Sequence, residues 1–223
     1  MDRASMKAHA KEQIKGKIIT LLAISIIIGL ITGAAGVILG PIGSIVTLLI
    51  TGAFVYAEAF IYLGITKKSR MPKIEDVFIG FKGDDFLRTL VAYLRYMIFT
   101  FLWSLLFWIP GIIKGISYSQ MFYLLAEDEK LDAAEAQKKS MEIMEGHKWE
   151  YFVLNLSFIP WYLLCAITLG LASIYVTPYV QTTFAEYHVR LMNSNKPAAK
   201  NAKEAKTVAK KATKKSTKKT TKK

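Results

Sequence analysis

The chain has 223 residues, 52% of them hydrophobic, and a formal net charge of +13. Between residues 18 and 65 the apolar sequence holds a single charged side chain, Glu58, whereas a helix on the surface of a soluble domain needs a polar face. This pattern excludes a soluble globular protein, and the presence of one cysteine, Cys165, excludes a disulfide framework.

The first predicted element is an amphipathic helix over residues 3–15. Basic residues recur at every fourth position, and an apolar stripe of Met6, Ala10 and Ile14 runs beside them. Adjoining basic and apolar stripes are typical of a short helix lying at an anionic membrane interface, with a solvated basic leader as the alternative. The apolar run that follows is of spanning length, which favours an uncleaved transmembrane helix over a signal peptide.

Two predicted spans follow, at about 18–39 and 42–65. Each is long enough, at ~1.5 Å per residue, to cross a hydrocarbon core of ~30 Å. The short turn at Gly40–Pro41 predicts that they form an antiparallel hairpin. Small residues on one face of the first span predict close approach of a neighbouring helix, namely Gly29, Gly33, Gly36 and Gly40.

Four further spans are predicted, at about 89–108, 112–126, 149–168 and 171–191. The segment 112–126 is short and polar, and taken alone it is a doubtful span. A water-facing helix is predicted between the second and third of these segments. It begins at Asp132, which has the spacing of a capping box with Glu135, and it leaves a small apolar stripe for docking at Ala133, Ala136, Ser140 and Ile143.

The number of crossings decides the topology. Six crossings give three hairpins with small outer turns and place every charged segment on one side of the membrane. Five crossings would put the lysine-rich end outside, although positive charge near span ends favours the cytosol. The sequence therefore predicts an all-α, polytopic plasma-membrane bundle of six transmembrane helices over residues 1–192, with both termini cytosolic.

Charged side chains inside the predicted spans are the candidates for function. Glu58, Arg95 and Glu186 lie at similar depths in spans two, three and six, so they are expected to meet in one intramembrane layer. Such groups are costly in a membrane and are usually paired. The layer is interpreted either as an ion pair that locks three helices together or as a gate or substrate site.

Enzyme signatures are not found in the sequence. The three histidines, His9, His147 and His188, have no metal-ligand spacing, and no motif places a nucleophile beside a base. We therefore expect no catalytic residues, no metal site and no cofactor.

The end of the chain, residues 193–223, holds twelve lysines and one acidic residue, Glu204. Such a segment lacks apolar mass and repels itself, so it is expected to be a disordered cytosolic tail. Anionic lipid of the inner leaflet is its expected partner, with nucleic acid or the ribosome as the alternative. The binding residues are expected to be Lys210, Lys211, Lys214, Lys215, Lys218, Lys219, Lys222 and Lys223.

Several short motifs follow one another in a fixed order across residues 6–192. The most specific is Ile109-Pro-Gly-Ile-Ile-Lys-Gly115, and it is followed by Leu125-Ala-Glu-Asp128, Gly146-His-Lys148 and Pro178-Tyr179. In these motifs the chain resembles the bacterial membrane family known as domain of unknown function nine-seven-five. The resemblance implies a polytopic protein of the plasma membrane. That family has no assigned activity, so it implies no functional residues.

Two functions from different classes remain open. The first is a non-enzymatic membrane scaffold that presents cytosolic surfaces and a polyanion-binding tail to membrane-protein partners or lipid. The second is a small transporter or pore that uses the charged layer. A scaffold would show these charges paired and dry, whereas a transporter would show a polar cavity inside the bundle.

Overall fold

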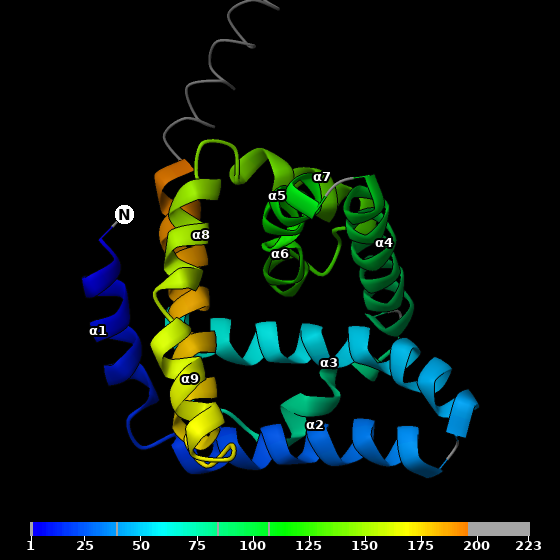
Figure 1. The fold of residues 1–223 in the computed structure, drawn as a ribbon, viewed down its shortest axis with the longest axis horizontal. Coiled ribbons are helices and arrows are strands. Elements are labelled where there is room, and N and C mark those ends of the chain that lie inside the picture. The colour runs from blue at the N-terminus through cyan, green and yellow to red at the C-terminus, as the bar shows by residue number, and fades with distance from the viewer. Residues whose placement is uncertain (1, 39, 84, 107, 196–223) are drawn as a thin grey trace, which may run out of the picture. The chain divides into compact units, whose positions relative to one another are not determined.

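The structure is a computed structural model that describes residues 2–38, 40–83, 85–106 and 108–195. Every regular element in those residues is helical, which confirms the all-α prediction (Figure 1). The final helix covers residues 173–195. The other elements, in chain order, are α1 (Arg3–Ile14), α2 (Ile18–Ile38), α3 (Gly40–Lys68), the 3₁₀ helix η1 (Ile74–Phe81), α4 (Asp85–Leu106), α5 (Trp108–Tyr118), α6 (Met121–Glu127), α7 (Ala133–Ile143), α8 (Lys148–Leu156) and α9 (Ile159–Ile167).

The chain divides into two compact units, Met1–Val189 and Arg190–Lys223, and the site lies in the first. Within the described residues, four stretches of helix are long and apolar enough to cross a membrane. They are Ile18–Ala35, Ile42–Lys68, Asp85–Leu105 and Lys148–Ile167.

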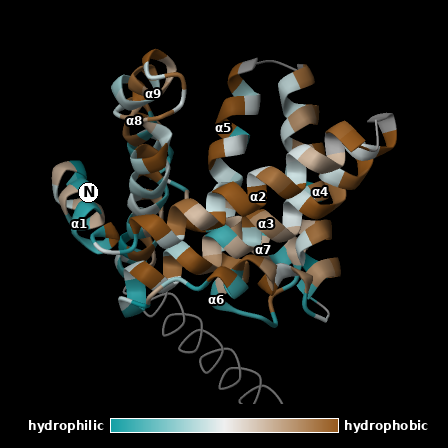
Figure 2. Cartoon of the chain, turned by 90° about the horizontal axis from the view of Figure 1, so that it is seen from below, coloured by the Kyte–Doolittle hydropathy of each residue, from teal (hydrophilic) through white to brown (hydrophobic). Residues whose placement is uncertain are grey.

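The outward faces of these helices carry large apolar side chains. Soluble monomers rarely expose contiguous apolar patches of this kind, which mark a surface that meets lipid or protein. Figure 2 shows hydrophobic colour along the helices and hydrophilic colour around α1 and beside α6. The exposed residues include Ile26, Leu30, Ile45, Ile98, Leu102, Leu105, Leu163, Leu164 and Ile167.

Helices α2 and α3 lie side by side, and the second half of α3 is buried in the core at Ala53, Tyr56 and Ala57 (Figure 1). The predicted close approach at the α2 glycines is wrong for Gly29 and Gly33, because a Cβ built on either would meet nothing within 4 Å. The close approaches lie elsewhere.

Two of these approaches join α3 to its neighbours η1 and α4. A Cβ on Gly80 would lie 2.4 Å from the Ala53 carbonyl oxygen, and one on Gly52 would lie 2.8 Å from Tyr93 Cβ of α4. Contacts this short require a residue without a side chain, so glycine allows α3 to pack closely against both η1 and α4.

Two predicted spans contain breaks. The segment 112–126 is divided between α5 and α6, which are separated at Ser119 and Gln120, and the segment 149–168 is divided between α8 and α9 at Ser157 and Phe158. Pro110 lies in the first turn of α5, where a missing backbone N–H is tolerated. The outer turn expected at Pro110–Gly111 thus falls inside α5, and the break in the segment 112–126 lies at Ser119 and Gln120.

The first break is closed by a side chain from α7. Ser140 Oγ donates to the Ser117 carbonyl oxygen at 2.7 Å and accepts from the Gln120 N–H at 3.2 Å. Helix α7 begins after Asp132, whose carboxylate accepts from the Glu135 N–H at 2.8 Å. The predicted docking stripe on α7 is confirmed, because Ala133, Ala136, Ser140 and Ile143 are all buried.

The second break is closed by α1. Lys7 Nζ donates to the Ser157 carbonyl oxygen at 3.0 Å and lies 4.1 Å from the centre of the Phe158 ring. The helix predicted at the start of the chain is confirmed as α1. However, its apolar stripe of Met6, Ala10 and Ile14 is buried against protein, so it is not free to rest on lipid as the interfacial interpretation expected.

Candidate functional site

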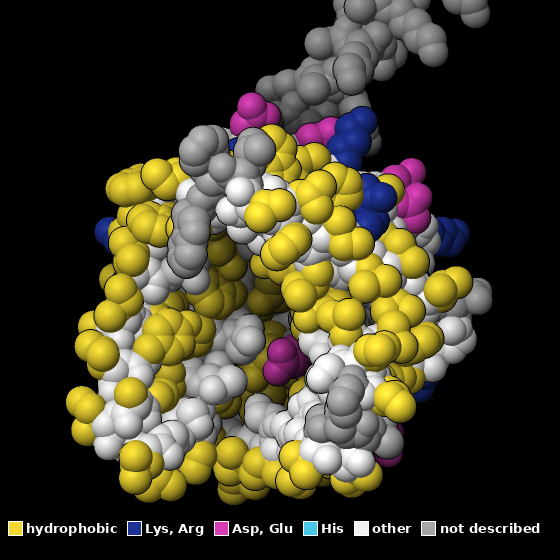
Figure 3. All heavy atoms as spheres, turned by 45° about the vertical axis from the view of Figure 1, so that its right-hand side comes forward, with side chains coloured by type: hydrophobic (Ala, Val, Ile, Leu, Met, Phe, Trp, Pro, Cys, Tyr) yellow, Lys and Arg dark blue, Asp and Glu magenta, His cyan; other side chains and the backbone are white. Residues whose placement is uncertain are grey.

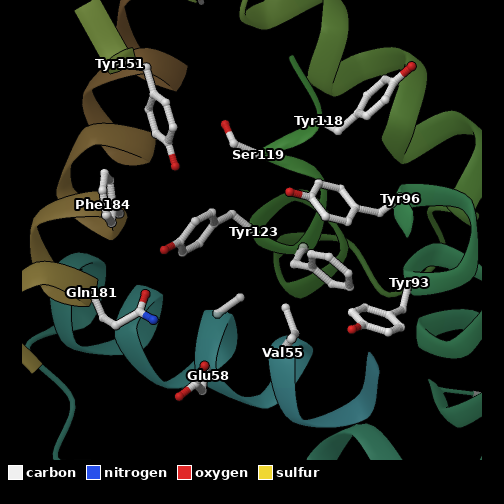
Figure 4. A pocket seen from close by; sticks show the side chains of 12 residues that line it. Val55, Glu58, Tyr93, Tyr96, Tyr118, Ser119, Tyr123, Tyr151, Gln181 and Phe184 are labelled. Carbon is white, nitrogen blue, oxygen red and sulfur yellow. The ribbon is translucent and has the colours of Figure 1, made fainter. Parts of the chain in front are cut away.

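A cavity of about 340 Å³ lies within the first unit, between α3, α4, the α5–α6 break, α8 and the final helix. Figure 3 shows a hollow in one face of the molecule with an acidic side chain at its base, and Figure 4 shows the lining residues. They are Val55, Glu58, Ala59, Tyr93, Tyr96, Tyr118, Ser119, Phe122, Tyr123, Tyr151, Gln181 and Phe184.

Glu58 belongs to α3, the helix that forms the floor of this pocket in Figure 4. It is half-buried, and its lining position shows that its exposed part faces the cavity. In the described part of the chain, no hydrogen bond or salt bridge joins its carboxylate to another residue. The chain therefore leaves one acidic group without a protein partner inside the bundle.

Aromatic rings form most of the pocket wall. Five of the lining residues are tyrosines, and two are phenylalanines. The rings support one another, since the Phe122 ring centre lies 6.4 Å from that of Tyr93 and 6.3 Å from that of Tyr96. In the described residues, the hydroxyls of Tyr96 and Tyr123 make no hydrogen bond with protein. Figure 4 shows the Tyr96 hydroxyl pointing toward the middle of the pocket and the Tyr123 hydroxyl pointing toward Gln181 and Phe184.

The break between α5 and α6 contributes Ser119 to the pocket. A chain of polar contacts starts there: Gln120 Nε2 donates to Ser119 Oγ at 2.8 Å, and Gln120 Oε1 lies 3.0 Å from His188 Nδ1. His188 is fully buried and stacks on Tyr123 with ring centres 5.1 Å apart. Its Nε2 lies 3.1 Å from Glu127 Oε1.

Glu127 ends this chain of contacts, where it also pairs with Lys67 at the end of α3. Burial alone would raise the pKa of Glu127. The hydrogen bonds and positive charges of His188 and Lys67 outweigh this and hold the pKa at about 2. The pocket is thus connected, through buried side chains, to a charged cluster at the end of α6.

The structure gives the three residues of the predicted layer different surroundings. Glu58 lines the pocket, whereas Arg95 Nε donates to Gln137 Oε1 of α7 at 3.0 Å. Glu186 Oε1 lies 3.1 Å from His9 Nδ1 of α1. No hydrogen bond or salt bridge in the described residues joins any two of these three charged residues.

Sequence reasoning missed the tyrosines, Gln120 and His188. A usable signal is the unusual polarity of residues 112–126, because polar side chains in a predicted span can line a pocket as well as weaken the span. His188 could not be found by spacing, since its partners Gln120 and Glu127 lie 68 and 61 residues away. The predicted lysine sites, from Lys210 to Lys223, lie outside the described residues.

A family model described as "Protein of unknown function (DUF975)" matches residues 1–117 and 105–195 of the chain. No curated protein and no solved structure matches the chain. The comparisons therefore supply a family, and the proposal of a function depends on the pocket.

Proposed function

The chain belongs to the DUF975 family of proteins of unknown function, and from this premise we propose that it is a multi-pass membrane protein that takes up a small solute in its pocket, as a small transporter. Four apolar helices support the membrane assignment. The proposal selects the second of the two functions that the sequence left open.

The observation that carries the proposal is the unpartnered carboxylate of Glu58. A charged side chain inside a membrane bundle is costly, and when its role is structural it is normally satisfied by another protein group. Arg95 and Glu186 have such partners, whereas Glu58 faces a cavity instead. A carboxylate kept in this position favours solute binding over a purely structural scaffold.

The helix breaks support the same proposal. Transporters commonly form their binding sites at discontinuous helices, where backbone is freed from the helical ladder near the middle of the membrane. Ser119 lies in the α5–α6 break and lines the pocket. The neighbouring free backbone groups are satisfied by Ser140, as non-helical backbone at membrane depth requires.

We retain six crossings as the topology. The two predicted crossings that are not among the four apolar stretches are α5–α6 and the final helix, and both line the pocket. A helix surrounded by others needs no continuous apolar surface, which accounts for their polarity.

The test is whether water-soluble reagents reach the pocket in a membrane. In a Cys165→Ala background, Ser119→Cys and Val55→Cys should each react with a small charged thiol reagent in liposomes. Leu163→Cys, exposed on α9 and expected to face lipid, is the matched control and should not react. Reaction of the pocket cysteines from both sides of the membrane supports transport. Absence of reaction at both would contradict the proposal.

The lysine tail adds a separate element. We propose that it rests on anionic lipid of the inner leaflet, because each lysine near such a surface contributes about 1 kcal/mol and the tail is tethered beside it. Nucleic acid is the competing partner. This contact is compatible with transport and with a scaffold, so it does not distinguish the two functions.

A further inference from the structure

We propose that the pocket binds an alkylammonium group, with Glu58 as its counter-ion and the tyrosine rings as its cage. The ammonium group could belong to a free amine in water or to the headgroup of a phospholipid. The inference rests on the proposed function, since it names the ligand class of the same pocket.

The sign of the charge comes from the lining. Glu58 is the one residue among the twelve lining residues that carries a charge, so the pocket presents a negative group and no positive one. Arg95, the nearest candidate by depth in the sequence, donates to Gln137 and does not line the pocket. An anionic solute would meet an unshielded carboxylate, whereas a cation would complete an ion pair in a poorly solvated space.

The chemical nature of the cation comes from the walls. A metal ion such as Ca²⁺ takes six to eight oxygen ligands, and within the described residues no group of three acidic, histidine or cysteine side chains could hold one. Aromatic faces instead attract organic cations, and quaternary ammonium groups are recognised by cages of such rings beside an acid. Seven aromatic residues line the pocket.

The polar groups that remain fit the same ligand. The free hydroxyls of Tyr96 and Tyr123 and the amide of Gln181 offer oxygen acceptors to an N–H donor of a primary amine. A methylated ammonium would use the ring faces alone. The cavity of about 340 Å³ lies at the small end of the range for ligand sites, about 300–1000 Å³, which suits a compact amine or one lipid headgroup.

The first experiment measures the thermal stability of the full purified chain in detergent. Tetramethylammonium, choline and ethylammonium chloride should each raise the melting temperature relative to sodium chloride at equal ionic strength. Sodium propionate should not. In Glu58→Gln the apparent affinity should fall by at least about tenfold, equivalent to the loss of one strong contact. Glu142→Gln, an exposed Glu-to-Gln change on α7, is the matched control and should keep the shift.

The cage is tested by two changes at one position. Tyr123→Phe keeps the ring and should change the affinity for tetramethylammonium less than about threefold, whereas Tyr123→Leu removes the ring and should reduce it by about tenfold. If Glu58→Gln does not fold, choline binding can be tested with Glu58 in place. Choline should then protect Val55→Cys from the thiol reagent, and an absence of protection would contradict the proposal.

The source of the ammonium group is decided in nanodiscs. Soluble choline that binds equally in phosphatidylglycerol and phosphatidylcholine discs indicates a free amine. Binding that is abolished by phosphatidylcholine or phosphatidylethanolamine indicates a headgroup. If the pocket cysteines react but propionate or a neutral solute, and no ammonium compound, stabilises the protein, the ammonium inference is overturned while the proposed function stands. If the cysteines do not react, the proposed function itself fails.

Discussion

Glu127 illustrates how the neighbours of one side chain determine its charge. Its carboxylate lies between the buried His188 and Lys67, and these positive groups outweigh burial and hold its pKa at about 2, below the ordinary value of 4.5. Because the folded pKa is depressed, the ionised carboxylate stabilises the fold fully above about pH 4.5. That contribution is lost as the pH falls toward 2.

We therefore expect Glu127→Gln to lower the stability of the protein by up to about 3 kcal/mol at neutral pH, as a shift of this size implies. The difference from the wild type should shrink as the pH falls from about 4.5 through 2 and vanish only below about 2. Thermal unfolding in detergent across this range measures it. Glu129→Gln, at an exposed position two residues later, should have little effect at any pH. A difference that does not depend on pH would contradict the assignment.

The residues that could be predicted from the sequence are those whose signal is local. Glu58 stands out because it is the one charge in a long apolar run, and this needs no knowledge of the fold. Its surroundings could not be predicted, because depth along a helix does not determine the face on which a residue points. Arg95 has the right depth but faces Gln137 of α7, and the tyrosine cage comes from four different helices.

At the scale of elements, the sequence predicted the helices and the turns between neighbours better than their contacts. Chain breakers at the helix ends are local signals, and α2–α3 and α4–α5 do pack together. The break at Ser157 and Phe158 has a local signal, because Pro160 stands in the first turn of α9. The break at Ser119 and Gln120 has none, since the residue that closes it, Ser140, is distant in the sequence. The close helix approach predicted at the glycine face of α2 was also wrong, because small residues permit a close approach but do not require one.

The two kinds of glycine can be compared directly. Gly80→Ala would place a Cβ 2.4 Å from the Ala53 carbonyl oxygen, so η1 or α3 must shift, at a cost of about 1–3 kcal/mol. Gly29→Ala meets nothing within 4 Å and should be neutral or slightly stabilising, because alanine is the better helix former. Melting temperatures of the two variants in detergent measure the difference. Equal effects would contradict the packing described for η1.

At the scale of the whole molecule, the segregation of charge in the sequence predicts the side of the membrane on which each segment lies. Apolar length identified four stretches, but it could not identify crossings that are enclosed by other helices. In the final helix Thr182, Thr183, Glu186 and His188 are all buried, so its polar side chains face protein and not lipid. Composition alone cannot separate such a helix from one outside the membrane.

The topology can be tested with single cysteines in the Cys165→Ala background. Ile42→Cys and Leu171→Cys should be labelled from outside intact cells by an impermeant reagent. Lys138→Cys and Lys210→Cys should be labelled only after permeabilisation, because six crossings place both on the cytosolic side. Labelling of Lys210→Cys in intact cells would rule out six crossings.

A fluorophore attached to Lys210→Cys should report membrane contact that weakens with salt if the tail binds anionic lipid.

The contacts of α1 also limit how early in synthesis the fold can be completed. Lys7 finds its acceptor at Ser157, 150 positions later in the chain, and His9 finds Glu186 later still. At roughly 5–20 residues per second, a ribosome takes on the order of ten seconds to make that length of chain. During this time Ser157 and Glu186 are not yet available to α1. We expect its basic and apolar stripes to bind the anionic membrane surface until they are. Helix α1 therefore makes these contacts only after the final helix has been synthesised.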